Sequence, residues 1–131
     1  MGGYGTIKFA LTQSQLFSKA AMLSAVFDVS MIGQYEWYDF SPQSVVGDAN
    51  HIAGTQFDPY YLVEQVVDQH KDLPQLYIKC GTEDELYQGN IDFIQFLNLK
   101  EVPYHFKEST GVHDYAYWDK AIKEVIEEFT A

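Results

Sequence analysis

Short apolar runs alternate with amphipathic segments along the chain. Residues 20–27 form a continuous, mostly apolar run without alternation, which is typical of a strand buried on both faces. Residues 75–80 and 102–107 are shorter runs with the length and composition of strands. Apolar positions at helical spacing come before, between and after these runs, so the pattern predicts strands that alternate with helices.

Helices are expected over residues 3–13, from residue 58 to just before Pro74, and over 87–99 and 115–129. Asp58 and Pro59 begin the second of these as an N-cap acid followed by proline at the first helical position. Glycines near the start of the first helix lower its propensity, so we expect them to serve a tight turn or close packing against a strand.

The final helix is predicted to be amphipathic. Its inner face is expected to carry the apolar residues Trp118, Ile122, Val125 and Phe129, and its lysines and glutamates are expected to lie outside.

The order of elements predicts an α/β fold. Helices between strands indicate right-handed βαβ units, and hence a three-stranded parallel sheet with flanking helices in a single domain over residues 1–131. Residues 28–57 are polar, aromatic and irregular, and are predicted to form a long loop. A helix packed on a sheet normally follows a strand. No strand precedes the first helix in this sequence, so we expect one edge of the sheet to be unpaired and apolar.

Composition narrows the function classes. The formal net charge of -11 over 131 residues argues against nucleic acid or an anionic membrane surface as partner. The single cysteine, Cys80, cannot form an internal disulfide. No apolar run approaches the roughly 20 residues that span a bilayer, and no signal segment begins the chain, so a cytoplasmic location is expected.

An acid and a histidine follow two neighbouring predicted strands. Asp84 comes shortly after residues 75–80, and His113 follows residues 102–107. The carboxyl ends of parallel strands are where such folds place their chemistry, and acid before histidine is the tail of the order Ser…Asp…His of α/β-hydrolases. The histidine accepts the proton of a serine hydroxyl, and the carboxylate holds its other ring nitrogen in the required tautomer.

Three motifs resemble one family of α/β-hydrolases. MGGYG (residues 1–5) resembles the second half of a nucleophile elbow, CGTEDELY (80–87) an acid loop, and GVHDYAYWD (111–119) a histidine loop of the esterase D-like family. That family includes the tributyrin esterases and the S-formylglutathione hydrolases. The resemblance runs from the first residue to the last helix, and the Gly-Tyr-Gly of the opening motif favours the tributyrin-esterase branch.

This resemblance implies a role for individual residues. Asp84 matches the triad acid, His113 the general base, and Met1 the residue after the nucleophile, whose backbone N–H helps to bind the oxyanion. The serine itself would lie one position before Met1. The resemblance therefore implies the C-terminal part of a serine carboxylesterase for short-chain acyl esters, without its nucleophile and without activity alone.

Several other residues compete for these roles. Cys80 as a substitute nucleophile would need a positive neighbour, and it sits at a strand end where a free cysteine is commonly a small buried hydrophobe. No cofactor is expected, and no metal site, because the histidines, the cysteine and the acids lack ligand spacing. The other candidates for the base are His51, His70 and His105, and those for the triad acid are Glu83, Glu85 and Asp114.

Two alternatives remain open at this point. The aromatic stretch at residues 35–40 could form a pocket wall or cap, or it could fold into a hydrophobic cluster of its own. The chain could also be a non-catalytic interaction module. An exposed sheet edge would then pair with a second copy, giving a homo-oligomer, or with a missing N-terminal half.

Overall fold

The computed structural model describes residues 1–34 and 41–131. Its sheet has three parallel strands in the order β1 (Lys19–Leu23), β2 (Gln75–Gly81) and β3 (His105–Ser109), which confirms the predicted sheet. The aromatic stretch at residues 35–40 lies outside the described residues. The helices are α1 (Gly2–Thr12), α2 (Pro42–Val46), α3 (Pro59–Asp68), α4 (Tyr87–Leu99) and α5 (Tyr115–Thr130), with short 3₁₀ turns η1 (Ser14–Leu16) and η2 (Val29–Gln34).

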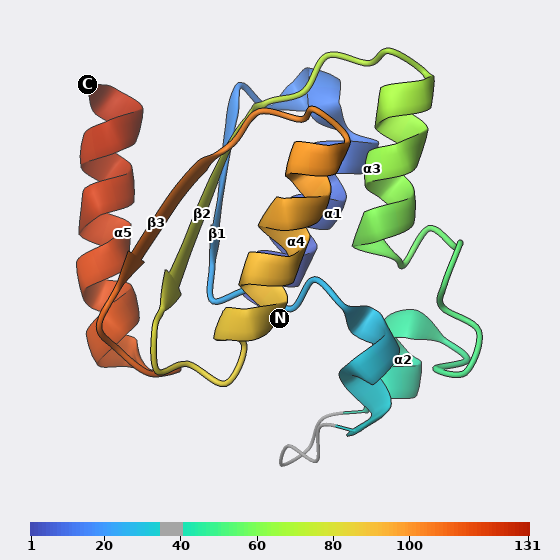
Figure 1. The fold of residues 1–131 in the computed structure, drawn as a ribbon, viewed down its shortest axis with the longest axis horizontal. Coiled ribbons are helices and arrows are strands. Elements are labelled where there is room, and N and C mark those ends of the chain that lie inside the picture. The colour runs from blue at the N-terminus through green and yellow to red at the C-terminus, as the bar shows by residue number, and fades with distance from the viewer. Residues whose placement is uncertain (35–40) are drawn as a thin grey trace.

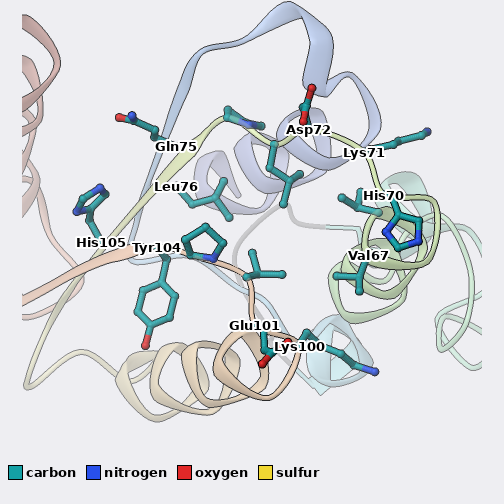
Figure 2. A pocket seen from close by; sticks show the side chains of 15 residues that line it. Val67, His70, Lys71, Asp72, Gln75, Leu76, Lys100, Glu101, Tyr104 and His105 are labelled. Atoms are coloured by element: carbon teal, nitrogen blue, oxygen red, sulfur yellow. The ribbon is translucent and has the colours of Figure 1, made fainter.

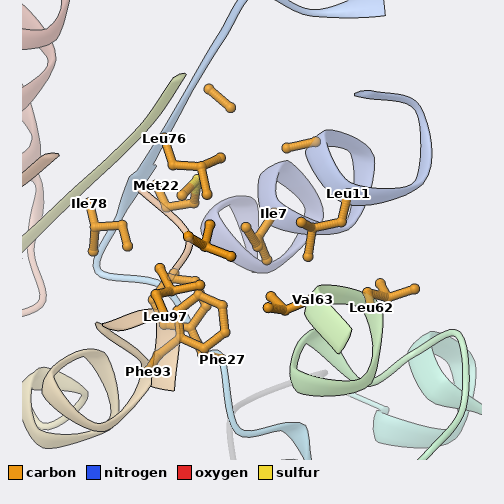
Figure 3. Packing of buried hydrophobic residues seen from close by; sticks show 14 of the residues in the cluster. Ile7, Leu11, Met22, Phe27, Leu62, Val63, Leu76, Ile78, Phe93 and Leu97 are labelled. Atoms are coloured by element: carbon orange, nitrogen blue, oxygen red, sulfur yellow. The ribbon is translucent and has the colours of Figure 1, made fainter. Parts of the chain in front are cut away.

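Helices cover both faces of the sheet unequally. Within the described residues, helices α1, α3 and α4 lie on one side of the sheet and α5 lies on the other (Figure 1). The main core fills the first side, where Met22 and Ile78 of the sheet meet Ile7 of α1 and Phe93 of α4 (Figure 3). Phe27 stacks on Phe93 with ring centroids 4.0 Å apart. This packing sets the positions from which the loops after each strand emerge.

The first strand is shorter than its apolar run predicted. β1 ends at Leu23, and Ser24 leaves the strand with a φ of 48°. Ala25, Val26 and Phe27 remain buried although they belong to no strand. The apolar run therefore indicates burial, but only its first part forms a strand.

The third strand also begins later than predicted. It starts at His105, because Val102 is occupied with the end of α4, where its N–H donates to the carbonyl of Leu97 at 2.9 Å. Pro103 then has no N–H to give to a ladder.

The segment at residues 28–57 was predicted as one loop, and it contains η2 and α2. Both elements are much shorter than the window of about 11 residues or more over which helical periodicity can be detected. The following helix, α3, ends at Asp68, several residues before Pro74. His70 adopts a φ of 52°, and the N–H of Lys71 donates to the Val66 carbonyl at 3.1 Å, which is a Schellman-type helix end.

The inner face of α5 differs from the prediction. Tyr117, Ala121 and Val125 are its buried residues, whereas Ile122 is 44% exposed. The cause is Lys79 of β2, which is buried beneath the helix and needs anionic partners. Two glutamates that were predicted to face outward turn toward the sheet to supply them; Glu124 and Glu128 lie 3.3 and 2.7 Å from its Nζ.

The glycines of α1 serve close packing at one position. A Cβ on Gly3 would lie 2.5 Å from the Cβ of Ala25, so only glycine lets the helix approach the segment after β1. The expected close packing is thus confirmed at Gly3, although its neighbour is a loop, whereas a Cβ on Gly2 or Gly5 would have no neighbour within 4 Å. No helix of the described part of the chain is long and apolar enough to cross a membrane.

Candidate active site

The acid loop follows β2 directly and is held by its own backbone. The N–H of Asp84 donates to the Gly81 carbonyl at 3.2 Å, and Asp84 Oδ1 accepts from the N–H of Leu86 at 2.8 Å. The Asp84 side chain has no exposed area. These bonds fix one carboxylate oxygen and leave Oδ2 to point away from the loop.

The histidine loop follows β3 and is tied to the acid loop. The N–H of Glu83 donates to the Gly111 carbonyl at 3.1 Å, and the N–H of Gly111 donates to Glu83 Oε2 at 2.8 Å. This second bond lowers the pKa of Glu83 below its usual range. A Cβ on Gly81 would lie only 2.2 Å from the Gly111 oxygen, so the two loops touch where glycine is required.

Asp84 and His113 meet across these two loops. His113 Nδ1 lies 3.0 Å from Asp84 Oδ2, within hydrogen-bonding distance. The His113 side chain is 26% exposed, so one part of the ring contacts the buried acid and another part reaches the surface. The indole of Trp118 packs edge-on against the imidazole, with ring centroids 4.8 Å apart.

A cavity of about 460 Å³ lies in front of the histidine. Met1 and Gly2 line it from the N-terminus of α1, His113 from the loop after β3, and Ser24 from the end of β1. Met1 is the N-cap residue of α1, so the first N–H groups of that helix lie near the cavity. The structure therefore brings together all three residues that the sequence singled out.

Comparisons with known proteins agree with this arrangement. A family model described as "Putative esterase" matches residues 1–129. The chain belongs to this esterase family. An acetyl esterase from Caldicellulosiruptor saccharolyticus is 29% identical over 97% of the chain and 50% of that protein.

Two solved structures from Staphylococcus aureus resemble this esterase chain closely, each at 50% identity. The fluorophosphonate-binding serine hydrolase FphF matches with a TM-score of 0.95 over 99% of the chain and 51% of FphF. The S-formylglutathione hydrolase FrmB matches with a TM-score of 0.92 over 100% of the chain and 52% of FrmB. A ferulic acid esterase, 22% identical, shares the fold with a TM-score of 0.72 over 95% of the chain and 45% of its own. The chain spans about half the length of these relatives.

The other acids that the sequence offered lie in different surroundings. Asp114 caps α5 by accepting from the N–H of Tyr117 at 2.9 Å, and Glu83 binds the histidine loop as described. Glu85 is exposed. Asp84 is the acid that reaches His113 through the hydrogen bond described above.

The other histidines lie apart from Asp84. His51 pairs with Asp48 at 2.6 Å on the surface, and His105 stacks on Tyr77 with ring centroids 4.5 Å apart. His70 is exposed at the end of α3. Their surroundings are those of surface histidines.

Cys80 is unsuited to act as a nucleophile. It is fully buried, and burial together with the nearby Asp84 carboxylate raises the pKa of its thiol to about 12. A nucleophilic cysteine needs the thiolate form near neutral pH. Among residues 1–34 and 41–131, no group of three or more histidines, cysteines and acids could hold a metal ion.

A larger cavity, of about 520 Å³, lies at the opposite end of the sheet. His70, Lys100, Tyr104 and His105 are among the residues around it, where β2 and β3 begin (Figure 2). Chemistry in parallel sheets gathers at the carboxyl ends of strands, so the smaller cavity beside His113 is the candidate site.

Two residues of the candidate site were missed by the sequence reasoning. Ser24 was counted within a strand, and Trp118 was assigned to the core face of the last helix. The one available signal was a lone hydroxyl in an otherwise apolar run. The contact between them could not be inferred, because 94 residues separate Ser24 from Trp118 in sequence.

Proposed function

We propose that this chain supplies the acid and the general base of a serine carboxylesterase that hydrolyses short-chain acyl esters. Asp84 is the triad acid and His113 the base, and the nucleophilic serine comes from polypeptide outside residues 1–131. The observation that carries the proposal is the Asp84–His113 hydrogen bond of 3.0 Å beside a cavity that the start of α1 also lines.

The roles follow from the chemistry of ester hydrolysis. The serine hydroxyl attacks the ester carbonyl and gives its proton to His113, and His113 returns it to the departing alkoxide. Asp84 holds Nδ1 and stabilises the imidazolium that forms. Water then attacks the acyl-enzyme with His113 as base, and the acid is released.

The start of α1 is proposed to stabilise the oxyanion. The backbone nitrogen of Met1 is the assigned donor, and it lies at the positive end of the α1 dipole beside the cavity. Backbone donors aimed at developing charge typically contribute a factor of about 10²–10³ in rate. No metal or other cofactor enters this scheme.

Complementation tests the proposal. The chain would be co-expressed with the half of the S. aureus FrmB that it does not match, and hydrolysis of p-nitrophenyl acetate would be measured. We expect activity from the pair and none from the chain alone. His113→Ala or Asp84→Ala should remove the activity of the pair, and the exposed Glu85→Gln should leave it unchanged.

Two results would contradict the proposal. One is hydrolysis by the purified chain alone that His113→Ala abolishes, because the nucleophile would then lie within the chain. The other is a reconstituted pair whose activity survives His113→Ala.

The acyl preference is proposed to be for small groups. A Gly-Tyr-Gly opening favours tributyrin-like substrates, and two relatives are named as an acetyl esterase and an S-formylglutathione hydrolase. A p-nitrophenyl series from formate to octanoate with the reconstituted pair would test this, and a maximum at or above hexanoate would contradict it. We also propose a cytoplasmic location, because the one cysteine is a buried free thiol.

The outer edge of β1 is the proposed site for the completing polypeptide. β1 pairs only with β2 within the described part of the chain. The 460 Å³ cavity and a second one of about 230 Å³ lie along β1, and Ala21 lines both. The second cavity is walled by Phe9, Phe17 and Phe129, of which Phe9 is 63% exposed.

The proposed occupant is a β-strand from the half of the family's length that this chain does not span. The matched share of 50–52% in three relatives leaves that half to be supplied. An unpaired strand edge beside apolar side chains favours strand addition. Ala21→Pro should prevent pairing with the FrmB half in light scattering, because proline removes an N–H and clashes within a paired strand. A second copy as occupant would instead give a homodimer of the chain alone.

A further inference from the structure

Ser24 occupies an unusual position at the end of β1. It is buried, with 4% of its surface exposed, and its φ of 48° is unfavourable for a residue with a Cβ. Its N–H donates to the Lys79 carbonyl at 2.9 Å, so the neighbouring strand holds it in this conformation. Its hydroxyl is thereby directed to a fixed place.

The Ser24 hydroxyl contacts the last helix. Its Oγ accepts the indole N–H of Trp118 at 3.1 Å. Trp118 lies in the first turn of α5, one turn after the histidine loop. The bond therefore joins the end of β1 to the segment that carries His113.

Trp118 in turn contacts the imidazole. Its ring meets that of His113 edge-to-face, with an interplanar angle of 89°. Tyr115 packs on the same indole with centroids 5.2 Å apart. Edge-to-face pairs have a preferred geometry, so a fixed indole favours one orientation of the imidazole.

Asp84 alone does not define that orientation. Its hydrogen bond holds one atom, Nδ1, and the ring can still rotate about that contact. A base must present its second nitrogen to the nucleophile with good geometry. Ser24, Trp118 and His113 line the same cavity, and the indole gives the imidazole ring a further contact on that side.

We propose that Ser24, acting through the indole of Trp118, is a positioning residue that orients His113 toward the cavity. The proposal rests on the proposed function, since orientation matters only for a base. Ser24 itself is not the nucleophile in this scheme, because its hydroxyl is buried and accepts the indole N–H.

Nuclear magnetic resonance of the ¹⁵N-labelled chain tests the proposal without turnover. In the wild type we expect His113 in the tautomer that carries its proton on Nδ1, with a slowly exchanging Nδ1–H. Ser24→Gly removes the hydroxyl and relaxes the positive φ, so that variant should stay folded. Trp118→Phe keeps an aromatic ring and removes the donor. Both should mix the tautomers and speed Nδ1–H exchange about fivefold, the factor that corresponds to losing one neutral hydrogen bond.

The control is Ser30→Ala. Its hydroxyl bonds the Asp28 carboxylate on the exposed part of the same connection, so His113 should not respond. His113 signals that stay at their wild-type values in either Ser24→Gly or Trp118→Phe would overturn the proposal. In the reconstituted pair, both variants should lower kcat with little change in KM, which a purely structural role would not produce. If the pair is inactive while the His113 signals respond, the proposed function fails and the orienting contact stands.

Discussion

Lys79 offers the sharpest test of what holds α5 on the sheet. Its side chain is 3% exposed, and its ammonium group lies 3.3 Å from Glu124 and 2.7 Å from Glu128. The two glutamates are 24% and 35% exposed, so the lysine is the desolvated partner. We therefore expect a strong asymmetry between removing the cation and removing the anions.

The magnitudes follow from which charge is left without a partner. The double variant Glu124→Gln with Glu128→Gln strands a buried ammonium, which typically costs about 3–5 kcal/mol. Lys79→Met replaces the cation with an apolar chain of similar length. The glutamates then keep access to water, and Glu124 keeps Lys107 at 2.9 Å, so the cost should stay within about 1 kcal/mol.

Urea unfolding at pH 7, followed by tryptophan fluorescence, measures both free energies by linear extrapolation. The double variant should also lose roughly 10–20 °C in Tm for a domain of this size. Glu127→Gln on the exposed side of α5 is the matched control and should change little. If Lys79→Met costs as much as the double variant, then the ion pairs stabilise the fold in themselves and the reasoning from desolvation is wrong.

Three further predictions concern the loops and the titrating groups. Gly81→Ala should displace the loop of Gly111, lower the free energy of unfolding by about 1–3 kcal/mol and weaken the Asp84–His113 bond, as seen in His113 spectra. The control is Gly89→Ala in α4, where a Cβ meets nothing within 4 Å; it should raise the free energy of unfolding by about 0.5–1 kcal/mol. The pKa of Glu124 is lowered chiefly by a hydrogen bond from Lys107. Its stabilising contribution is therefore present above its ordinary pKa of 4.5 and is lost as the pH falls through its lower pKa in the folded protein. A Tm that stays flat from pH 6 to 3 would contradict this. Burial raises the pKa of Tyr4 to about 12, so stability should fall as the pH rises from 10 to 12, and absorbance at 295 nm should show a tyrosine class that ionises only with unfolding.

The layer architecture was predictable because it depends on periodicity. Buried apolar runs and amphipathic helices recur in a strict order, and that order admits few topologies once handedness is imposed. The three-stranded parallel sheet therefore follows from the pattern, whereas the strand order β1-β2-β3 was not predicted.

The ends of elements were less predictable because local exceptions decide them. β1 ends before Ser24, which has a positive φ, and β3 begins only after Pro103. The rotation of α5 depends on Lys79, whose burial cannot be seen in its own segment. A helical wheel places charged residues on the outer face, but Glu124 and Glu128 face the sheet because they bind Lys79.

The pair Asp84 and His113 was predictable for a geometric reason. Both residues follow neighbouring parallel strands at the same edge of the sheet, where their loops must meet. The support from Ser24 and Trp118 was not predictable, because it depends on the exact ends of β1 and of the histidine loop.

Under the proposed function, the contacts of the acid and histidine loops can be separated from those of the cavity in front of His113. The acid and histidine loops are joined by backbone bonds from Thr82 to Ser109 and from Glu83 to Gly111, and these residues lie after β2 or at and after the end of β3. These two loops therefore hold each other without any contact to a strand beyond the outer edge of β1. The cavity in front of His113, by contrast, is bounded by the end of β1 and the start of α1, which border the unpaired edge. If the proposed function holds, a completing strand would change the surroundings of the cavity while leaving the Asp84–His113 bond in place, so His113 should already be bound to Asp84 before the proposed partner binds.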